Sequence, residues 1–293
     1  MKVNPECIRC IVNTRINEIL GSLGSIDETI DIQIDLLREA HRVFKSGKEL
    51  TRVATEIYRW LVNRAPRVAE YYRNIKRKGI DRALAEINRY RALIEGIEGY
   101  EKFRVATKIS IAGNLLDSGV YGHSPPERLD PGRVLGMEFS IDDTKRVYGE
   151  LVGGGKNVLW LFDNAGEAVY DIVLVETIRG YGNRVIGVVK EDPGFQNDLT
   201  VEDVVYAGLE RYFDEIVSMG YSGATIHLDE ISRELKKLIA LANLVIAKGM
   251  AHYEYVSEVD LGKPVWFLLV PKCEPISRSL GVERYTLVAF YRG

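Results

Sequence analysis

Short runs of apolar residues, each ending at a polar residue, mark the second half of the chain. Residues 158–162 are apolar without interruption and are followed by Asp163 and Asn164, and the apolar residues of 165–178 then recur at helical spacing. An unbroken apolar run of this length predicts a strand buried on both faces, and the spacing after it predicts a helix. The pattern therefore places Asp163 and Asn164 at a strand-to-helix turn.

Similar runs predict further strands, separated by helical segments. Strands are predicted over residues 184–189, 213–217, 243–247, 265–270 and 285–291, and helices from about Val201 and over 231–241. Strands that alternate with helices indicate a parallel α/β sheet. Because parallel strands all end at one edge, the polar residues that follow them are expected to gather there, where open α/β sheets bind ligands.

Residues 1 to about 120 have helical periodicity instead. Ser25 and Glu28 have the spacing of a capping box at the start of one helix. Buried helix faces are predicted at Val53, Ile57, Trp60 and Leu61, at Ile80, Ala83, Ile87 and Tyr90, and at Phe103, Ala106, Ile109 and Ala112. Residues 121–138, rich in Pro and Gly, are predicted to form a loop, and a helix should follow over about 142–151. We therefore predict a helical domain over residues 1–125 and a Rossmann-like α/β domain over residues 126–293.

Composition narrows the function classes. The net charge of −3 argues against a large sequence-independent contact with nucleic acid. No apolar run approaches the length that spans a bilayer, and the amino terminus has no apolar signal-peptide core. We expect a cytoplasmic protein with neither a membrane nor a nucleic-acid partner. Three cysteines are too few for a disulfide framework.

The residues that follow the predicted strands indicate a chemistry. They are Asp163, Asn164, Asp198, Lys248 and Lys272. Carboxylate and amide oxygens suit a divalent cation, and lysines suit a phosphate. Any one of these residues alone is more simply read as an exposed cap or loop charge. All five at one edge favour a site for phosphoryl transfer or phosphate-ester hydrolysis.

Two glycine-containing stretches have simpler readings. The stretch 113–119 ends an apolar helix with two glycines, which fits either a close approach to another segment or a plain helix end with Gly119 in the left-handed region. Taken alone, it favours the helix end. The run 153–156 lacks the Ser or Thr of a phosphate loop and precedes its strand instead of following it, so we interpret it as a connector.

Several motifs together resemble one known family. They are residues 113–119 (Gly-Asn-Leu-Leu-Asp-Ser-Gly), 163–167 (Asp-Asn-Ala-Gly-Glu), 197–198 (Asn-Asp), 248–254 (Lys-Gly-Met-Ala-His-Tyr-Glu), 272–273 (Lys-Cys) and 7–10 (Cys-Ile-Arg-Cys). In this order the motifs resemble those of the metal-dependent damage-control phosphatases, formerly grouped as domain of unknown function eighty-nine, and of their CxxC-bearing branch. The resemblance covers nearly the whole chain.

The resemblance implies a fold, a metal and a reaction. It implies a helical amino-terminal part on a Rossmann-like core. It also implies one divalent metal ion, manganese, nickel, cobalt or magnesium, held by Asp163, Asn164 and Asp198. Lys248 would contact phosphate and act in catalysis with Asp163 and Asn164. Further residues that would bind substrate or phosphate are Asn114, Asp117, Glu167 and Glu254. The implied enzyme is a phosphatase that hydrolyses phosphate esters of small metabolites, damaged or side-product sugar phosphates or nucleotides among them.

The resemblance has departures and open points. Met250 and His252 stand where the family often has Gln and Asn, which bears on the substrate more than on the metal. Cys7 and Cys10 share a helix face, and no second pair completes a zinc site, so they are either two small buried residues or a functional pair. The natural substrate, the preferred metal and the oligomeric state are not determined by the sequence.

The sequence leaves two nucleophiles open for the mechanism. Either a metal-bound water or the carboxylate of Asp163 attacks phosphorus. The haloacid-dehalogenase pattern is excluded, because Ala165 stands where a second Asp is required.

Two rival functions are also open. A methyltransferase using S-adenosylmethionine would place a glycine-rich turn after the first strand, where Asp163 and Asn164 stand. A non-catalytic metabolite-binding module built on Cys7 and Cys10 is the other rival.

Overall fold

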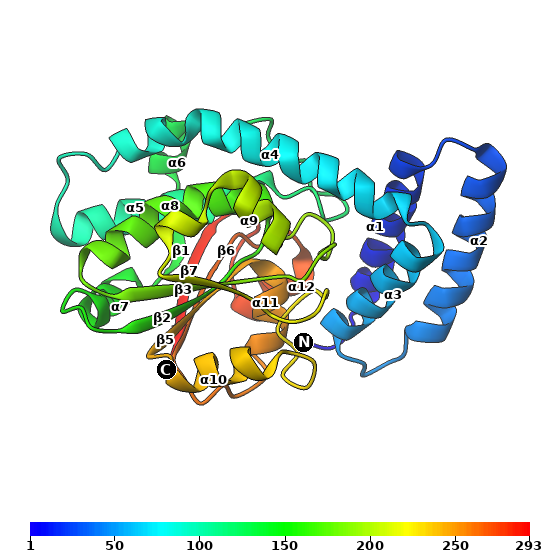
Figure 1. The fold of residues 1–293 in the computed structure, drawn as a ribbon. Helices are drawn as coiled ribbons and strands as arrows, with labels where there is room; N and C mark the ends of the chain where they lie inside the picture. The colour runs from blue at the N-terminus through cyan, green and yellow to red at the C-terminus, as the bar shows by residue number, and fades with distance from the viewer.

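A seven-stranded sheet forms the centre of the computed structural model, which describes all residues 1–293 (Figure 1). The strands are β1 (Phe139–Asp142), β2 (Asn157–Leu161), β3 (Arg184–Val189), β4 (Glu215–Ser218), β5 (Leu244–Lys248), β6 (Val265–Leu269) and β7 (Leu287–Arg292). Their order across the sheet is β1-β7-β6-β5-β2-β3-β4. The six strands predicted from apolar runs are all present, so the predicted mixed α/β fold is confirmed.

The two outer strands on one side correct the prediction of an all-parallel sheet. β7 runs antiparallel to β6, and β1 pairs parallel with β7. The reason is the connection 270–286, which contains only the short α12 (Glu274–Leu280) and stays at the edge where β6 ends. The chain therefore enters β7 at that edge and returns. β1 was missed because it is a four-residue edge strand with alternating burial.

Twelve α-helices accompany the sheet. Besides α12 they are α1 (Pro5–Ser22), α2 (Ile26–Val43), α3 (Leu50–Arg64), α4 (Arg67–Ala92), α5 (Gly99–Gly113), α6 (Pro131–Gly136), α7 (Thr144–Leu151), α8 (Ala165–Gly180), α9 (Val201–Ala207), α10 (Arg233–Leu241) and α11 (Gly249–Val256). The predicted loop 121–138 contains α6, which Pro131 starts and the side chain of Asp130 caps by accepting from the Arg133 N–H. None of the helices is long and apolar enough to cross a membrane.

The helices cover both faces of the sheet. α4, α5 and α8 lie on one face, where Phe103 of α5 stacks on Trp266 of β6 with ring centroids 5.6 Å apart (Figure 1). α10, α11 and α12 cover the other face. α4 and α8 approach closely at two glycines: a Cβ on Gly166 would lie 3.3 Å from the backbone carbon of Gly79. This contact brings α4 near the start of α8, which is the turn that carries Asp163.

α1, α2 and α3 form a separate bundle at one end of the molecule (Figure 1). Its core contains buried residues of all three helices and of the first turns of α4, together with Phe195 and Ala224 from loops of the α/β part. The bundle therefore packs against the loops at the edge where the parallel strands end. α4 and α5 share their core with the sheet. The domain division at residue 125 stays a prediction.

Candidate active site

The turn after β2 and the loop after β3 are joined by backbone hydrogen bonds. The Ala165 N–H donates to the Asn197 carbonyl at 2.9 Å, and the Leu199 N–H donates to the Asp163 carbonyl at 2.8 Å. Asn164 and Asp198 form an isolated β-bridge between these bonds. The neighbouring strands thus bring Asp163, Asn164 and Asp198 together, which is what the sequence predicts for polar residues that follow parallel strands.

Two side-chain amides hold Asp163 against a second carboxylate. The Asp163 Oδ2 atom accepts from Asn114 Nδ2 at 2.9 Å and from Asn164 Nδ2 at 3.0 Å. The same two nitrogens donate to Glu167 Oε2, at 2.7 and 3.0 Å. Burial, together with the nearby charges of Glu167 and Asp198, raises the pKa of Asp163 well above its usual range. Asn114 and Glu167 are therefore close to Asp163, although neither lines the cavity described below.

Asp198 is buried beside a lysine that does not fully pair with it. Its Oδ2 lies 3.5 Å from Lys190 Nζ and has no hydrogen-bond donor. The Lys190 ammonium donates to the Ala224 carbonyl at 3.0 Å instead. Burial raises the pKa of Asp198 to about 7, against the opposing effect of the Lys190 charge. A buried carboxylate oxygen without a donor is a candidate ligand for a cation.

Asp117 belongs to the same group and is neutralised by the second predicted lysine. Its Oδ2 is 2.7 Å from Lys272 Nζ, and its Oδ1 accepts from Asn197 Nδ2 and the Gly119 N–H. Burial raises the pKa of Asp117, but the Lys272 charge and these bonds outweigh it, so the net shift is downward.

The glycines of residues 113–119 have a different role from the one expected. Gly119 does not have a positive φ, so the left-handed helix end expected there is wrong. The stretch 113–119 instead makes a close approach, because a Cβ on Gly113 would lie 3.2 Å from Glu167 Cγ.

Lys248 points away from this group and into the core. Its Nζ lies 2.6 Å from Asp171 Oδ1, 2.8 Å from Glu167 Oε1 and 2.9 Å from Ser110 Oγ. It is fully buried and does not line the cavity. A sequence signal existed: side chains alternate along β5, so Lys248 faces the same helices as Leu244 and Ile246. Lys248 therefore lies outside the cavity lining, and its predicted phosphate contact stays a prediction.

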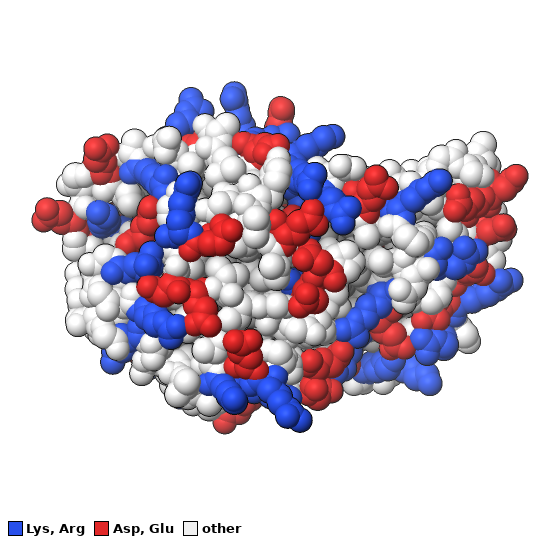
Figure 2. All heavy atoms as spheres, viewed as in Figure 1, with Lys and Arg blue, Asp and Glu red and all other residues white.

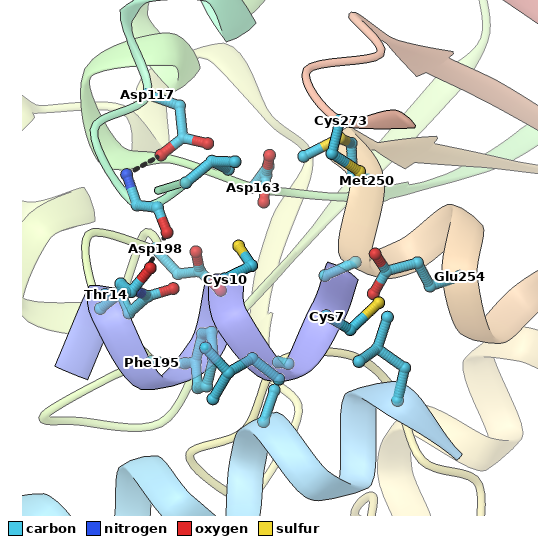
Figure 3. Close-up of a pocket in the computed structure, with 18 of the residues that line it drawn as sticks. Cys7, Cys10, Thr14, Asp117, Asp163, Phe195, Asp198, Met250, Glu254 and Cys273 are labelled. Atoms are coloured by element: carbon cyan, nitrogen blue, oxygen red, sulfur yellow. Dashed lines mark hydrogen bonds between the residues drawn. The ribbon is translucent and has the colours of Figure 1, made fainter. Parts of the chain in front are cut away.

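A cavity of about 160 Å³ lies between the bundle and the sheet edge. Asp117, Asp163, Asn164 and Asp198 line one part of it, and Glu254 lines another. Figure 3 shows α1 along its lower side, with Cys7 and Cys10 directed at the cavity. The two cysteines are therefore part of the cavity wall and are not simply packed inside the bundle. Whether they form a functional pair stays a prediction.

Most of the residues that α1 contributes to the cavity wall were not predicted from the sequence. Besides the two cysteines, this wall includes Ile11, Thr14 and Arg15. Arg15 is buried, forms an ion pair with Glu18 at 2.7 Å and lies 4.9 Å from the ring centroid of Tyr58. No spacing in the sequence signals these residues, since their partners at the sheet edge lie more than a hundred positions away.

The oxygen atoms of Asp163, Asn164 and Asp198 fit a metal ion whose remaining coordination positions would be filled by water or substrate. No group of three His, Cys, Asp or Glu side chains forms a ready metal site in this chain. Asp163 and Asp198 supply two carboxylates, and Asn164 supplies an amide oxygen that such a count leaves out. Oxygen donors of this kind suit hard divalent cations, which commonly keep several waters. The raised pKa of Asp163 and the bare oxygen of Asp198 are both consistent with a cation at this position.

Comparison with known proteins identifies the family. Residues 3–288 match the damage-control phosphatase ARMT1-like domain. The chain belongs to this family. A damage-control phosphatase of Archaeoglobus fulgidus is 31% identical over 99% of both chains, and one of Pyrococcus horikoshii is 29% identical over 98% of this chain and 97% of that one. An uncharacterized protein of Methanocaldococcus jannaschii is 30% identical over 97% of this chain and 93% of its own length.

A solved structure has the same fold. The crystal structure of a DUF89 family protein from Pyrococcus horikoshii superposes with a TM-score of 0.84 at 28% identity, over 100% of both chains. The predicted family is thus confirmed, and membership in a damage-control phosphatase family supports the phosphatase role expected from the sequence. The CxxC-bearing branch, the metal and the residue roles stay predictions.

Proposed function

We propose that the protein is a metal-dependent phosphatase that hydrolyses phosphate monoesters of small metabolites in the cavity beside α1. The observation that carries the proposal is the convergence of Asp163, Asn164 and Asp198 on one side of this cavity. The family and the two relatives named as damage-control phosphatases support the reaction class. Side-product phosphometabolites, sugar phosphates or nucleotides among them, are the proposed substrate class.

Asp163, Asn164 and Asp198 would hold one divalent cation, manganese, nickel, cobalt or magnesium. When bound, the cation supplies a Lewis acid that offsets negative charge on the phosphate oxygens. The backbone N–H groups that open α11 also suit phosphate oxygens, since no side chain caps this helix and its residues Met250 and Ala251 line the cavity. Lys272 adds a buried positive charge next to Asp117. The attacking group is either water or the Asp163 carboxylate.

The other predicted residues act by holding these groups in place. Asn114 and Asn164 fix the orientation of the Asp163 carboxylate through the bonds to Oδ2. Glu167 accepts from both amides, and the Lys248 ammonium forms an ion pair with the other carboxylate oxygen of Glu167 on the side of the core. In this assignment Lys248 positions the site and does not contact phosphate. The network holds the buried Asp163 carboxylate in one orientation, aimed at the cavity, and partners of this kind commonly orient metal ligands.

The decisive test is a turnover screen. Metal-free protein is mixed with a panel of phosphate monoesters and with each of the four divalent ions in turn, and released phosphate is measured. We expect hydrolysis that requires the ion and that disappears in Asp198→Asn. Calorimetric titration with S-adenosylmethionine serves as the control. Binding of that cofactor without phosphate release under any ion would replace the proposal with the methyltransferase.

A further inference from the structure

The cavity has two chemically different ends. Asp117, Asp163 and Asp198 lie at one end, where the metal and phosphate are proposed to bind (Figure 3). Four sulfur-containing side chains also line the cavity, and we call them the sulfur-lined subsite: Cys7, Cys10, Met250 and Cys273. Figure 3 shows Cys7, Met250 and Cys273 away from Asp117 and Asp198, with Cys10 between the two groups. These residues come from α1, from α11 and from the residue that caps α12. Three separate segments therefore bring sulfur to one place.

The subsite presents an apolar surface at neutral pH. Burial raises the pKa of the Cys7 thiol to about 11 and that of Cys273 to about 12, and it also raises the pKa of Cys10. All three thiols are therefore neutral, and a neutral thiol behaves as a small apolar group. Ile11, Leu50 and Pro275 extend the apolar lining around them.

Few polar groups at this end would satisfy the hydroxyls of a sugar. The charged side chains there are Glu254 and Glu6, of which Glu6 pairs with Arg278. A hydroxyl that leaves water and finds no partner weakens binding by roughly tenfold. An alkyl or aryl group in the same place buries apolar surface without such a loss. The cavity volume of about 160 Å³ is also well above the roughly 10–15 Å³ that one water needs, so there is room for an organic group.

We propose that the sulfur-lined subsite binds an alkyl or aryl leaving group of the substrate, so that the enzyme prefers phosphate monoesters with few hydroxyls. The inference rests on the proposed function for the position of the phosphate. It assigns Cys7 and Cys10 to substrate specificity, and it narrows the substrate class away from sugar phosphates.

Binding and turnover of two ligands with six carbons test this inference. Hexylphosphonate and the phosphonate analogue of glucose 6-phosphate are titrated by calorimetry into protein with Mn²⁺, and hydrolysis of hexyl phosphate and glucose 6-phosphate is measured beside them. We expect at least tenfold tighter binding of the hexyl ligand. Equal or tighter binding of the sugar analogue, or binding of neither ligand, overturns the subsite. Turnover that favours glucose 6-phosphate overturns the subsite and leaves the phosphatase intact, whereas the expected binding order without any turnover overturns the phosphatase alone.

A pair of variants at Cys10 ties the preference to the thiol. Cys10→Ser replaces the sulfur with a hydroxyl and should reduce the preference for the hexyl ligand about tenfold. Cys10→Ala keeps the site apolar and should change the preference less than threefold. Melting curves confirm that both variants fold. If the two variants behave alike, Cys10 does not determine specificity.

The outer face of α2 supports a second, independent inference. Ile26, Ile30, Ile34 and Leu37 are 77%, 50%, 44% and 56% exposed. Their spacing of four, four and three places them in one row along the helix. The opposite face of α2 is buried in the bundle, and Figure 1 shows α2 at its free edge. A continuous exposed apolar row of this kind marks an interaction surface.

Acidic and basic side chains are mixed over the end of the molecule that carries α2 (Figure 2), and the charges beside the row are self-complementary in sequence. Asp27 and Asp31 flank its first half, and Arg38 and Arg42 flank its second half on the same side. In an antiparallel pair of α2 helices centred on Ile34, Asp31 would come beside Arg38 of the second copy and Asp27 beside Arg42. These contacts would add to the partners that the chain itself provides, which are Asp35 for Arg38 and Glu39 with Glu56 for Arg42. Ile30 then packs against Leu37 of the second copy.

We infer that a second copy of this chain docks on the α2 row in this antiparallel arrangement. Sedimentation from 1 to 100 μM protein at low salt tests it, with a dimer expected at the upper end. Ile34→Glu should abolish the dimer, while Val205→Glu, at an exposed apolar residue of α9 (65% exposed), should not. Asp31→Arg should weaken it, and Asp31→Arg with Arg38→Asp should restore it. A monomer at every concentration, or a dimer unaffected by Ile34→Glu, overturns the inference.

Discussion

The carboxylate of Asp163 lies against the backbone of Gly249. A Cβ built on Gly249 would be 1.8 Å from Asp163 Oδ2, and Gly249 has a φ of +75°. The contact arises because β2 and β5 are neighbours, with Leu161 opposite Ala247, so both chains leave the sheet side by side. Glycine at 249 therefore sets how closely α11 approaches the site.

Gly249→Ala should displace the Asp163 carboxylate. We expect metal affinity and turnover to fall at least a hundredfold, because the Asp163 carboxylate, a proposed metal ligand, cannot keep its position beside a methyl group. Calorimetric metal titration and phosphate release measure the effect. Gly262→Ala is the matched control: its φ is +65° but nothing lies within 4 Å, so only backbone strain is added. Equal losses in both variants would show that strain, and not the Asp163 contact, is responsible.

Asp198→Asn should abolish metal binding and turnover without unfolding the protein. The change keeps the shape of the side chain and removes the charge that the bare Oδ2 would offer to a cation. Circular dichroism and metal titration on the same sample separate the two effects. Wild-type turnover with metal still bound would remove Asp198 from the site.

Lys248→Met should destabilise the fold more than any change at the cavity surface. It leaves the carboxylates of Glu167 and Asp171 buried without their shared ammonium, and breaking a buried pair in this way costs about 3–5 kcal/mol. Urea unfolding of the metal-free protein measures it, with Lys236→Met on the exposed side of α10 as control. An unchanged midpoint together with weaker phosphate binding would restore the role predicted from the sequence.

His227 should make the fold less stable in acid. Its buried ring lies 2.9 Å from Thr51 Oγ1 of α3 and 3.0 Å from the Tyr221 hydroxyl oxygen, and burial lowers its pKa to about 3. The unfolded chain takes up a proton below about pH 6.5, whereas the folded chain does so only near pH 3. Stability from the neutral ring is therefore complete above pH 6.5 and is lost as the pH falls, by about 1.4 kcal/mol per unit.

Unfolding of His227→Gln between pH 7 and pH 4 checks this expectation. The difference in unfolding free energy between wild type and variant should shrink as the pH falls, since the variant has no ring to protonate. His41→Gln, at an exposed residue of α2, should leave the pH profile unchanged. A difference that stays constant with pH would contradict the assignment.

Local patterns were enough to find the strands and the residues at their ends. The apolar runs predicted β2 and β5, and the abrupt change to Asp163 and Lys248 marked the edge of the sheet. The same patterns did not reveal which way each side chain turns. Lys248 is still inside the alternation of β5 and faces the core, whereas Asp163 lies one residue beyond the buried Phe162 and faces the cavity.

The sequence by itself determined the fold class, the family and the fact that Asp163, Asn164 and Asp198 lie together at one sheet edge, because each depends on the ends of strands that short segments encode. Only the tertiary structure decided that β7 reverses, that Lys248 is internal and that Cys7 and Cys10 of α1 face Asp163 across a cavity. These features depend on how a separate helical bundle packs on the sheet edge. Such long-range packing is set by whole surfaces, and no motif within a single segment records it.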